Sequence, residues 1–305
     1  MLVIVCPGQG SQTPGFFTPW LELPAFRETI EIAQSAAGID LLTYGTISDA
    51  DTIKDTAVAQ PLIVSASLAS YAALVSAGFK GVTGVAGHSV GELAAASIAG
   101  VFDTATAMEF VTKRGAEMAK AAALTKSSMA AVLGGDRDEV VAYLEARGLS
   151  AANYNGSGQI VAAGDSDGIA ALATEPLAGT RVIPLAVAGA FHTKFMEPAV
   201  AELANYAAGL QSADAQMKLW SNKDGSVVQS GTQYKDLLVN QVSNPVRWDL
   251  CMEAMLAAGV TALIELSPAG TLAGLAKRGM PGVETLALKT PDQLDAAIEL
   301  AKNHG

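Results

Sequence analysis

Several residue types are scarce in this chain of 305 residues, and each scarcity argues against a class of protein. The two cysteines, Cys6 and Cys251, are too few for a disulfide framework, so a reducing cytoplasm is the expected compartment. No Cys/His cluster has metal-site spacing, and we expect no metal. With 19 basic against 30 acidic residues, the formal net charge is −11, which argues against nucleic acid and anionic membranes as partners.

The sequence also lacks a long apolar run free of polar residues, so we expect no membrane span. The apolar start, residues 1–6, is short and follows no basic segment, so it predicts a strand and not a signal peptide. Half of the residues are hydrophobic, which is enough to bury a sizeable core. The length favours one large domain with a smaller one added.

Strand and helix patterns alternate over the first 122 residues, as in a parallel sheet covered by helices on both faces. Pro61 is expected in the first turn of its helix, and Asp103 is expected to cap another. The predicted strands are 2–6 and 82–86, and the predicted helices are 25–37, 61–77, 90–100 and 103–122.

The middle of the chain predicts the order β-α-β-β-α-β, which is the ferredoxin-like pattern. Its strands are expected at 128–133, 149–153, 159–163 and 181–187, with helices at 136–147 and 166–178. We therefore predict an α/β protein in which residues 125–189 form a small inserted domain and residues 1–124 and 190–305 form the large domain. In the second part of the large domain we expect helices at 195–209, 234–242 and 249–258, a strand at 260–265 and a further helix, with the last residues frayed.

The sequence Gly87-His88-Ser89-Val90-Gly91 matches the G-x-S-x-G pattern of a nucleophile elbow. The pattern alone is weak in a chain with 30 glycines. Its context strengthens it, because an apolar strand precedes Ser89 and an alanine-rich helix follows. Amides at the start of that helix can stabilise an oxyanion, so Ser89 is the predicted nucleophile.

A serine nucleophile needs a base, and the chain has only three histidines. His304 is penultimate and expected to be disordered, and His88 adjoins Ser89 on a tight turn and is poorly placed. His192 remains. It follows an apolar stretch and is expected near the end of a strand, which is where the sites of α/β proteins assemble. No acidic residue that could orient His192 is evident, so a backbone carbonyl is the alternative.

Arg114 lies in the middle of the apolar stripe of the helix after Asp103. A buried guanidinium requires a partner, because an unpaired buried charge is very costly. The sequence leaves two interpretations open. Arg114 forms a structural salt bridge, or it receives a substrate carboxylate with the bidentate geometry that arginine offers.

Gly8-Gln9-Gly10 lacks the third glycine of a dinucleotide-binding loop, since Thr13 stands in its place. The motifs together resemble the malonyl-CoA:acyl carrier protein transacylase family, related to acyltransferase domains of fatty acid and polyketide synthases. The resemblance spans nearly the whole chain. It rests on Pro7-Gly8-Gln9-Gly10-Ser11-Gln12, Gln60-Pro61, residues 87–92, Arg114-Gly115, Gly189-Ala190-Phe191-His192, residues 244–248, Gly270-Thr271-Leu272 and Lys277-Arg278.

The resemblance implies a hydrolase-like core domain with a ferredoxin-like insert, and a role for each residue that matches a motif. Ser89 would carry the acyl group, His192 would be its base and Arg114 would hold the malonyl carboxylate. The backbone amides of Gln9 and Val90 would form the oxyanion hole, and the main-chain carbonyl of Gln241 would orient His192. The implied pocket residues are Phe191, Asn155 and His88, and Phe191 would crowd a methyl group on the substrate.

The implied substrates are malonyl-CoA and an acyl carrier protein that brings its own phosphopantetheine, with no permanently bound cofactor and with a monomeric enzyme. An acidic carrier conflicts with the net charge of −11, so a local basic patch must attract it. The candidate cations are Lys194, Arg247, Lys277 and Arg278. Two other functions remain open: a serine hydrolase, which usually pairs its histidine with an acid, and a non-catalytic carrier-binding protein.

Overall fold

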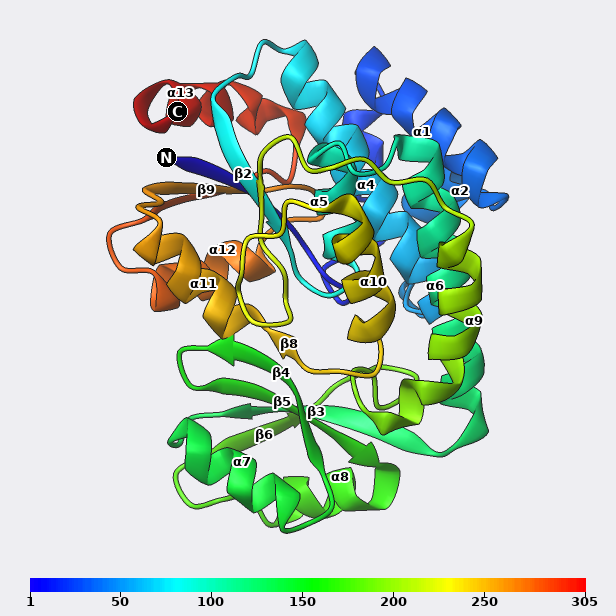
Figure 1. Ribbon diagram of the computed structural model, residues 1–305, viewed down its shortest axis with the longest axis vertical. Helices are drawn as coiled ribbons and strands as arrows, with labels where there is room; N and C mark the ends of the chain where they lie inside the picture. The colour runs from blue at the N-terminus through cyan, green and yellow to red at the C-terminus, as the bar shows by residue number, and fades with distance from the viewer.

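The computed structural model describes all 305 residues and contains two sheets (Figure 1). The first sheet is parallel throughout, with the strand order β10-β9-β1-β2-β7. Its central strand β1 is buried at all five positions, as expected for a strand covered on both faces. The strands are β1 (Leu2–Cys6), β2 (Val82–Gly87), β7 (Lys218–Leu219), β9 (Ala262–Glu265) and β10 (Glu284–Ala287).

Helices cover both faces of this sheet, and the alternation of side chains along β1 explains why two cores form. Leu2, Ile4 and Cys6 join the larger core, whereas Val3 and Val5 join the smaller one. The larger core contains residues of α1 (Pro24–Ala37), α2 (Leu41–Thr46), α3 (Ala50–Ile53), α4 (Thr56–Ser76), α5 (Gly91–Ile98), α6 (Thr104–Leu124), α9 (Glu197–Ala208), α10 (Gly231–Gln241) and α13 (Leu294–His304). The smaller core contains residues of α11 (Trp248–Ala257) and α12 (Thr271–Gly279).

The second sheet has the order β6-β3-β5-β4-β8 and lies at one end of the molecule (Figure 1). Each of its first four strands is antiparallel to its neighbours, which with two helices gives the ferredoxin-like order predicted from the sequence. One face of these strands packs with α7 and α8 in a core of its own, whereas residues such as Met129 and Val161 belong to the larger core. The elements are β3 (Ser127–Leu133), α7 (Arg137–Glu145), β4 (Ser150–Gly156), β5 (Gln159–Asp165), α8 (Ser166–Thr174) and β6 (Arg181–Pro184).

The fifth strand of this sheet, β8 (Val246–Arg247), comes from far along the chain and pairs in parallel with β4. The ferredoxin-like unit is therefore attached to the rest of the molecule by a strand pair as well as by its two connecting segments. The division of the chain at 124/125 and 189/190 stays a prediction.

The long helix α4 differs from the prediction, because it begins at Thr56 and holds Pro61 in its interior. The side chain of Asp55 caps the helix by accepting a hydrogen bond from the Ala57 N–H, so the cap and not the proline sets the start. By length and composition alone α4 could cross a membrane, but 78% of its most apolar window is buried inside the protein. It is a core helix, and Figure 1 shows it among α1, α5 and α6.

The end of the chain also differs from the prediction. Helix α13 continues to His304, whose imidazole lies 2.9 Å from Thr261 Oγ1 and 3.2 Å from a carboxylate oxygen of Glu284. His304 is therefore ordered and far from the predicted site. No prediction covered the strands β7, β8 and β10 or the helices α2, α3 and α13. Single-turn 3-10 helices also occur at Thr18–Trp20, Lys194–Met196 and Pro291–Gln293.

Candidate active site

Ser89 lies in the tight turn between β2 and α5, with a φ of 52° in the left-handed region. The glycines on either side leave no room for a side chain. A Cβ at Gly87 would lie 2.0 Å from the carbonyl carbon of Gly91, and one at Gly91 would lie 2.2 Å from the Cys6 oxygen. These contacts explain why the G-x-S-x-G pattern is required for this turn.

His192 lies beside Ser89, as the elimination among the three histidines predicted. Its Nε2 is 2.7 Å from Ser89 Oγ, and its Nδ1 is 2.8 Å from the main-chain oxygen of Gln241. A carbonyl oxygen only accepts hydrogen bonds, so Nδ1 carries the proton and Nε2 is left to accept from the serine hydroxyl. Burial, and then the positive charge of Arg114, lower the pKa of His192 to about 3. The imidazole is therefore neutral and able to act as a base.

Arg114 is buried in α6 with only 1% of its surface exposed, and one of its terminal nitrogens is 3.4 Å from Ser89 Oγ. Its other close partners are the side-chain oxygens of Gln60, at 2.7 Å, and Gln241, at 2.9 Å. None of these groups is a carboxylate, and its Nε has no partner. The structural salt bridge considered from the sequence is therefore wrong.

Burial lowers the pKa of Arg114 to about 10, so the guanidinium keeps its charge at neutral pH. A buried cation with neutral partners is poorly compensated, and a carboxylate brought next to it is strongly attracted. The arrangement places the hydroxyl of Ser89 between this cation, at 3.4 Å, and a neutral base, at 2.7 Å.

The loop that follows β1 packs against the turn that holds Ser89. A Cβ at Gly8 would lie 2.9 Å from both Nδ1 and the main-chain oxygen of His88, so only glycine allows this approach. The N–H groups of Gln9 and Val90 donate no hydrogen bond within the protein. The Gln9 side chain instead contacts Thr56 and the Lys54 carbonyl, at 3.4 Å each.

A cavity of about 260 Å³ opens beside Ser89 and His192, between the two sheets. Phe191, Met118 and Met129 give the cavity apolar lining, and residues of β3, β4 and β5 in the second sheet also line it. The cavity is lined by Gly8, Gln9, Gly10, Gln60, His88, Ser89, Val90, Met118, Met129, Ala131, Asn153, Asn155, Gln159, Val161, Leu185, Val187, Phe191, His192, Thr271, Leu272 and Leu275.

His88 also faces this cavity, but its Nε2 is engaged with the side-chain oxygen of Asn155 at 2.9 Å. Burial lowers the pKa of His88, so its neutral ring donates from Nε2 to that oxygen. The contact joins the turn after β2 to β4, and the ring also packs edge-on against Trp248. His88 is thus directed away from Ser89 Oγ, as the sequence predicted.

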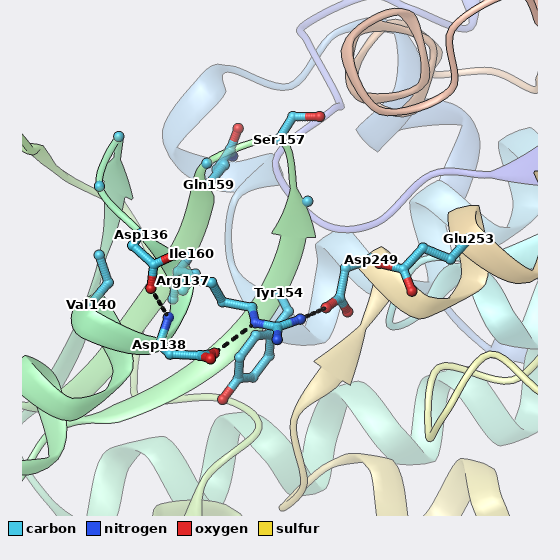
Figure 2. Close-up of a pocket in the computed structure, with 14 residues that line it drawn as sticks. Asp136, Arg137, Asp138, Val140, Tyr154, Ser157, Gln159, Ile160, Asp249 and Glu253 are labelled. Carbon is cyan, nitrogen blue, oxygen red and sulfur yellow. Dashed lines mark hydrogen bonds and ion pairs between the residues drawn. The ribbon is translucent and has the colours of Figure 1, made fainter.

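A second cavity, of about 250 Å³, lies near the tip of the β4–β5 hairpin (Figure 2). Asp136, Arg137, Tyr154 and Asp249 line it, and none of the predicted catalytic residues does. Figure 2 shows the side chain of Arg137 extending between Asp138 and Asp249, so the one cation of this cavity is already paired with two of its carboxylates. No group of three or more His, Cys, Asp or Glu side chains is arranged to hold a metal ion anywhere in the structure.

Comparisons with known proteins place this geometry in a family. The model of the acyl transferase domain family matches residues 3–292. The chain belongs to the acyl transferase domain family. It is 49% identical to the malonyl CoA-acyl carrier protein transacylase of Mycobacterium tuberculosis over 98% of this chain and 100% of that protein. It is 35% identical to the Escherichia coli protein of the same name over 97% and 98% of the two chains.

Solved structures of similar proteins agree with this acyl transferase fold. A Mycobacterium tuberculosis crystal structure superposes with a TM-score of 0.93 at 48% identity, covering 98% of this chain and 99% of that one. A malonyl-transacylase in complex with a type II polyketide synthase acyl-carrier protein gives 0.94 at 29% identity, with the same coverage. The α/β fold class and the resemblance inferred from the motifs are confirmed.

The sequence did not predict a role in this acyl transferase site for two residues, Glu92 and Asn222. Glu92 is 1% exposed, and Asn222 accepts a hydrogen bond from the Ser89 N–H at 2.8 Å. A lone carboxyl at the start of an otherwise apolar helix was an available signal for Glu92. Asn222 lies in an irregular loop between β7 and α10 and offers no such signal.

Proposed function

We propose that this chain transfers a malonyl group from malonyl-CoA to the phosphopantetheine thiol of an acyl carrier protein, through an ester on Ser89. The observation that carries the proposal is the position of Arg114. It is a buried cation with only neutral partners, 3.4 Å from the hydroxyl of Ser89. A carboxylated acyl group satisfies this cation when its carbonyl reaches the serine.

In the first half-reaction, Ser89 Oγ attacks the thioester carbonyl carbon and gives its proton to His192 Nε2. The free N–H groups of Gln9 and Val90 receive the developing oxyanion. The carbon–sulfur bond then breaks, and the proton on His192 passes to the departing thiolate of coenzyme A. The main-chain oxygen of Gln241 holds Nδ1 throughout and takes the orienting role that an acid has in many serine enzymes.

In the second half-reaction, the carrier thiol gives its proton to His192 and attacks the malonyl ester. The bond from the acyl carbon to Ser89 Oγ breaks, and the serine takes the proton back. Because one base and one cavity serve both halves, the substrates follow each other and ping-pong kinetics result. No permanently bound cofactor is needed, and we propose that the protein acts as a monomer in the cytoplasm.

Phe191 is the proposed determinant for malonyl over methylmalonyl groups. It lines the cavity next to His192 and is only 6% exposed, so it has little freedom to move aside. An added methyl group would meet this ring. Discrimination of one methyl group in an apolar pocket is worth roughly 10–200-fold.

We propose that the carrier docks at the last turn of α12. Leu272 and Leu275 of this helix line the cavity, and the exposed cations Lys277 and Arg278 follow directly. Arg278 lies 3.5 Å from Gln159, which also lines the cavity. Of the other two candidates, Arg247 is engaged by both carboxylate oxygens of Asp249, and Lys194 packs beside the Phe195 ring.

Intact-protein mass spectrometry after brief incubation with malonyl-CoA tests the proposal. The wild type is expected to gain one malonyl group and to lose it when the carrier with its phosphopantetheine is added. Ser89→Ala is expected to gain nothing. Rapid release of coenzyme A without an adduct would indicate a hydrolase, and neither adduct nor release would overturn the proposal.

A further inference from the structure

Glu92 lies in the first turn of α5, three residues after Ser89, and does not line the substrate cavity. Glu92 and Gln241 are instead among the residues that line a separate cavity of about 490 Å³. Glu92 is therefore not placed to contact a substrate in the cavity beside Ser89. Burying a carboxyl there is costly, and burial raises its pKa to about 8, so its retention calls for a compensating role.

One oxygen of Glu92 holds the nucleophile turn through Asn222. Glu92 Oε1 accepts a hydrogen bond from the Asn222 N–H at 2.6 Å. The Asn222 side chain accepts from the Ser89 N–H and donates to the Gly87 oxygen, both at 2.8 Å. These two bonds fix the asparagine amide in one orientation, and they restrain the left-handed backbone of Ser89.

The other oxygen of Glu92 holds Gln241, which touches both of the remaining groups. Gln241 Nε2 donates to Glu92 Oε2, and Gln241 Oε1 accepts from Arg114 at 2.9 Å. The main-chain oxygen of the same residue accepts from His192 Nδ1. The Gln241 amide therefore has one allowed orientation, with its donor toward Glu92 and its acceptor toward Arg114.

From these contacts we infer that Glu92 is a positioning residue that sets the Gln241 amide so that Arg114 is held for the substrate carboxylate. The inference rests on the proposed malonyl transfer. Asn222 and Gln241 each place an N–H donor against a different oxygen of Glu92, so position 92 must accept at two oxygens, which an amide cannot do.

Glu92→Gln has nearly the same shape but only one acceptor. The NH2 group of the new glutamine then faces the N–H of either Asn222 or Gln241. If the Gln241 amide rotates to avoid this contact, its own NH2 group faces Arg114. Because acetyl groups do not use Arg114, malonyl transfer should suffer more than acetyl transfer. The ratio of Ser89 malonylation to acetylation rates, measured by intact mass, is expected to fall about tenfold or more.

A matched control is Glu265→Gln. Glu265 is also fully buried and also accepts from backbone N–H groups, those of Gly270, Leu272 and Ala273, but it does not contact Gln241 or Arg114. It is expected to lose stability with an unchanged malonyl-to-acetyl ratio. An unchanged ratio in Glu92→Gln, or an equal loss of both rates, would show a merely structural role and overturn the inference.

The exchange Glu92→Gln with Gln241→Glu covers the case in which the single variant fails to fold. The new amide at position 92 then donates to the new carboxylate at position 241, and that carboxylate accepts from Arg114. Only the 3.2 Å bond from Gln241 Nε2 to Asn222 Oδ1 is lost, and Asn222 Oδ1 keeps the Ser89 N–H as its donor. This double variant should fold but should still discriminate against malonyl, because its carboxylate now neutralises Arg114. A wild-type ratio in the double variant would overturn the inference, whereas absence of a malonyl adduct in the wild type would instead overturn the proposed function.

Discussion

Ser89 Oγ and His192 Nε2 lie 2.7 Å apart, although 103 positions separate the two residues in the chain. Both residues have left-handed backbone, with φ values of 52° and 61°. Such backbone costs about 1–3 kcal/mol at a residue other than glycine and needs support from its surroundings. The Ser89 N–H bonds to Asn222, and the His192 N–H bonds to the Val242 oxygen at 3.0 Å. The strained turns are thus held from two different loops.

The environment of His192 predicts an unusual pH dependence. Its pKa is lowered to about 3, by burial and then by Arg114, so it stays neutral well below the usual value of about 6.5. The rate of Ser89 acylation is therefore expected to stay flat as the pH falls from about 7 to about 5, a range that also lies below the raised pKa of Glu92. Rapid-quench mass spectrometry across this range checks the expectation, and a fall centred near 6.5 would contradict it.

The lowered pKa of His192 also predicts how the free energy of unfolding changes with pH. Because the folded pKa of His192 lies below the unfolded value, protons bind preferentially to the unfolded state. The stabilisation by neutral His192 is complete above about pH 6.5 and decreases as the pH falls toward 3. Urea unfolding of His192→Gln should therefore show a smaller loss of stability between pH 6.5 and 4.5 than the wild type shows.

Arg114→Ala is expected to separate malonyl from acetyl substrates. Malonyl transfer should fall about a hundredfold or more, because a desolvated charge pair with the substrate is lost. Acetyl transfer should fall far less, since an acetyl group has no carboxylate to place beside Gln60 and Gln241. The kcat/KM values for the two acyl-CoA substrates give the comparison. Equal losses would contradict the carboxylate role of Arg114.

Two helical glycines differ in the space around them and predict opposite effects of alanine. A Cβ at Gly91 would lie 2.2 Å from the Cys6 oxygen, whereas one at Gly274 would meet no atom within 4 Å. Gly91→Ala should lower the free energy of unfolding by about 3 kcal/mol or more. Gly274→Ala should raise it by roughly 0.5–1 kcal/mol, because glycine is costly inside a helix. Urea unfolding of both variants checks the difference.

The sequence predicted the parts of this site that rest on scarce residue types or local patterns. With only three histidines, elimination led to His192, and the helical stripe around Arg114 indicated its burial. The roles of Glu92 and Asn222 depend on hydrogen bonds across 130 positions, which leave no local pattern. The two-residue strands β7 and β8 are likewise defined by their partners and not by their own residues.

The start of α4 shows how one local signal can hide another. Pro61 suits a first turn, and that preference placed the helix start at the proline. The side chain of Asp55 offers a cap more than one turn earlier, and residues 56–60 have no feature that opposes a helix. At the other end of the chain, His304 was expected to be disordered, but its contacts with Thr261 and Glu284 hold it in place.

Docking of the carrier at the end of α12 predicts a charge-dependent Michaelis constant. The protein is strongly acidic, so an acidic carrier approaches productively only where cations gather, and Arg278 is exposed beside the cavity residue Gln159. Arg278→Glu should raise the KM for the carrier about tenfold at low salt. The effect should shrink as salt screens the charges, with a Debye length of about 10 Å at 0.1 M.

Lys302→Glu is the matched control for Arg278→Glu. Lys302 lies on α13, pairs with Glu299 at 3.2 Å and is not among the residues of the substrate cavity. Its substitution makes the same change in net charge, so it reports the effect of overall repulsion alone. If both variants raise the carrier KM equally, the field of the whole protein governs the encounter, and the last turn of α12 is not the docking surface. A larger effect of Arg278→Glu, lost at high salt, would assign the encounter to that turn.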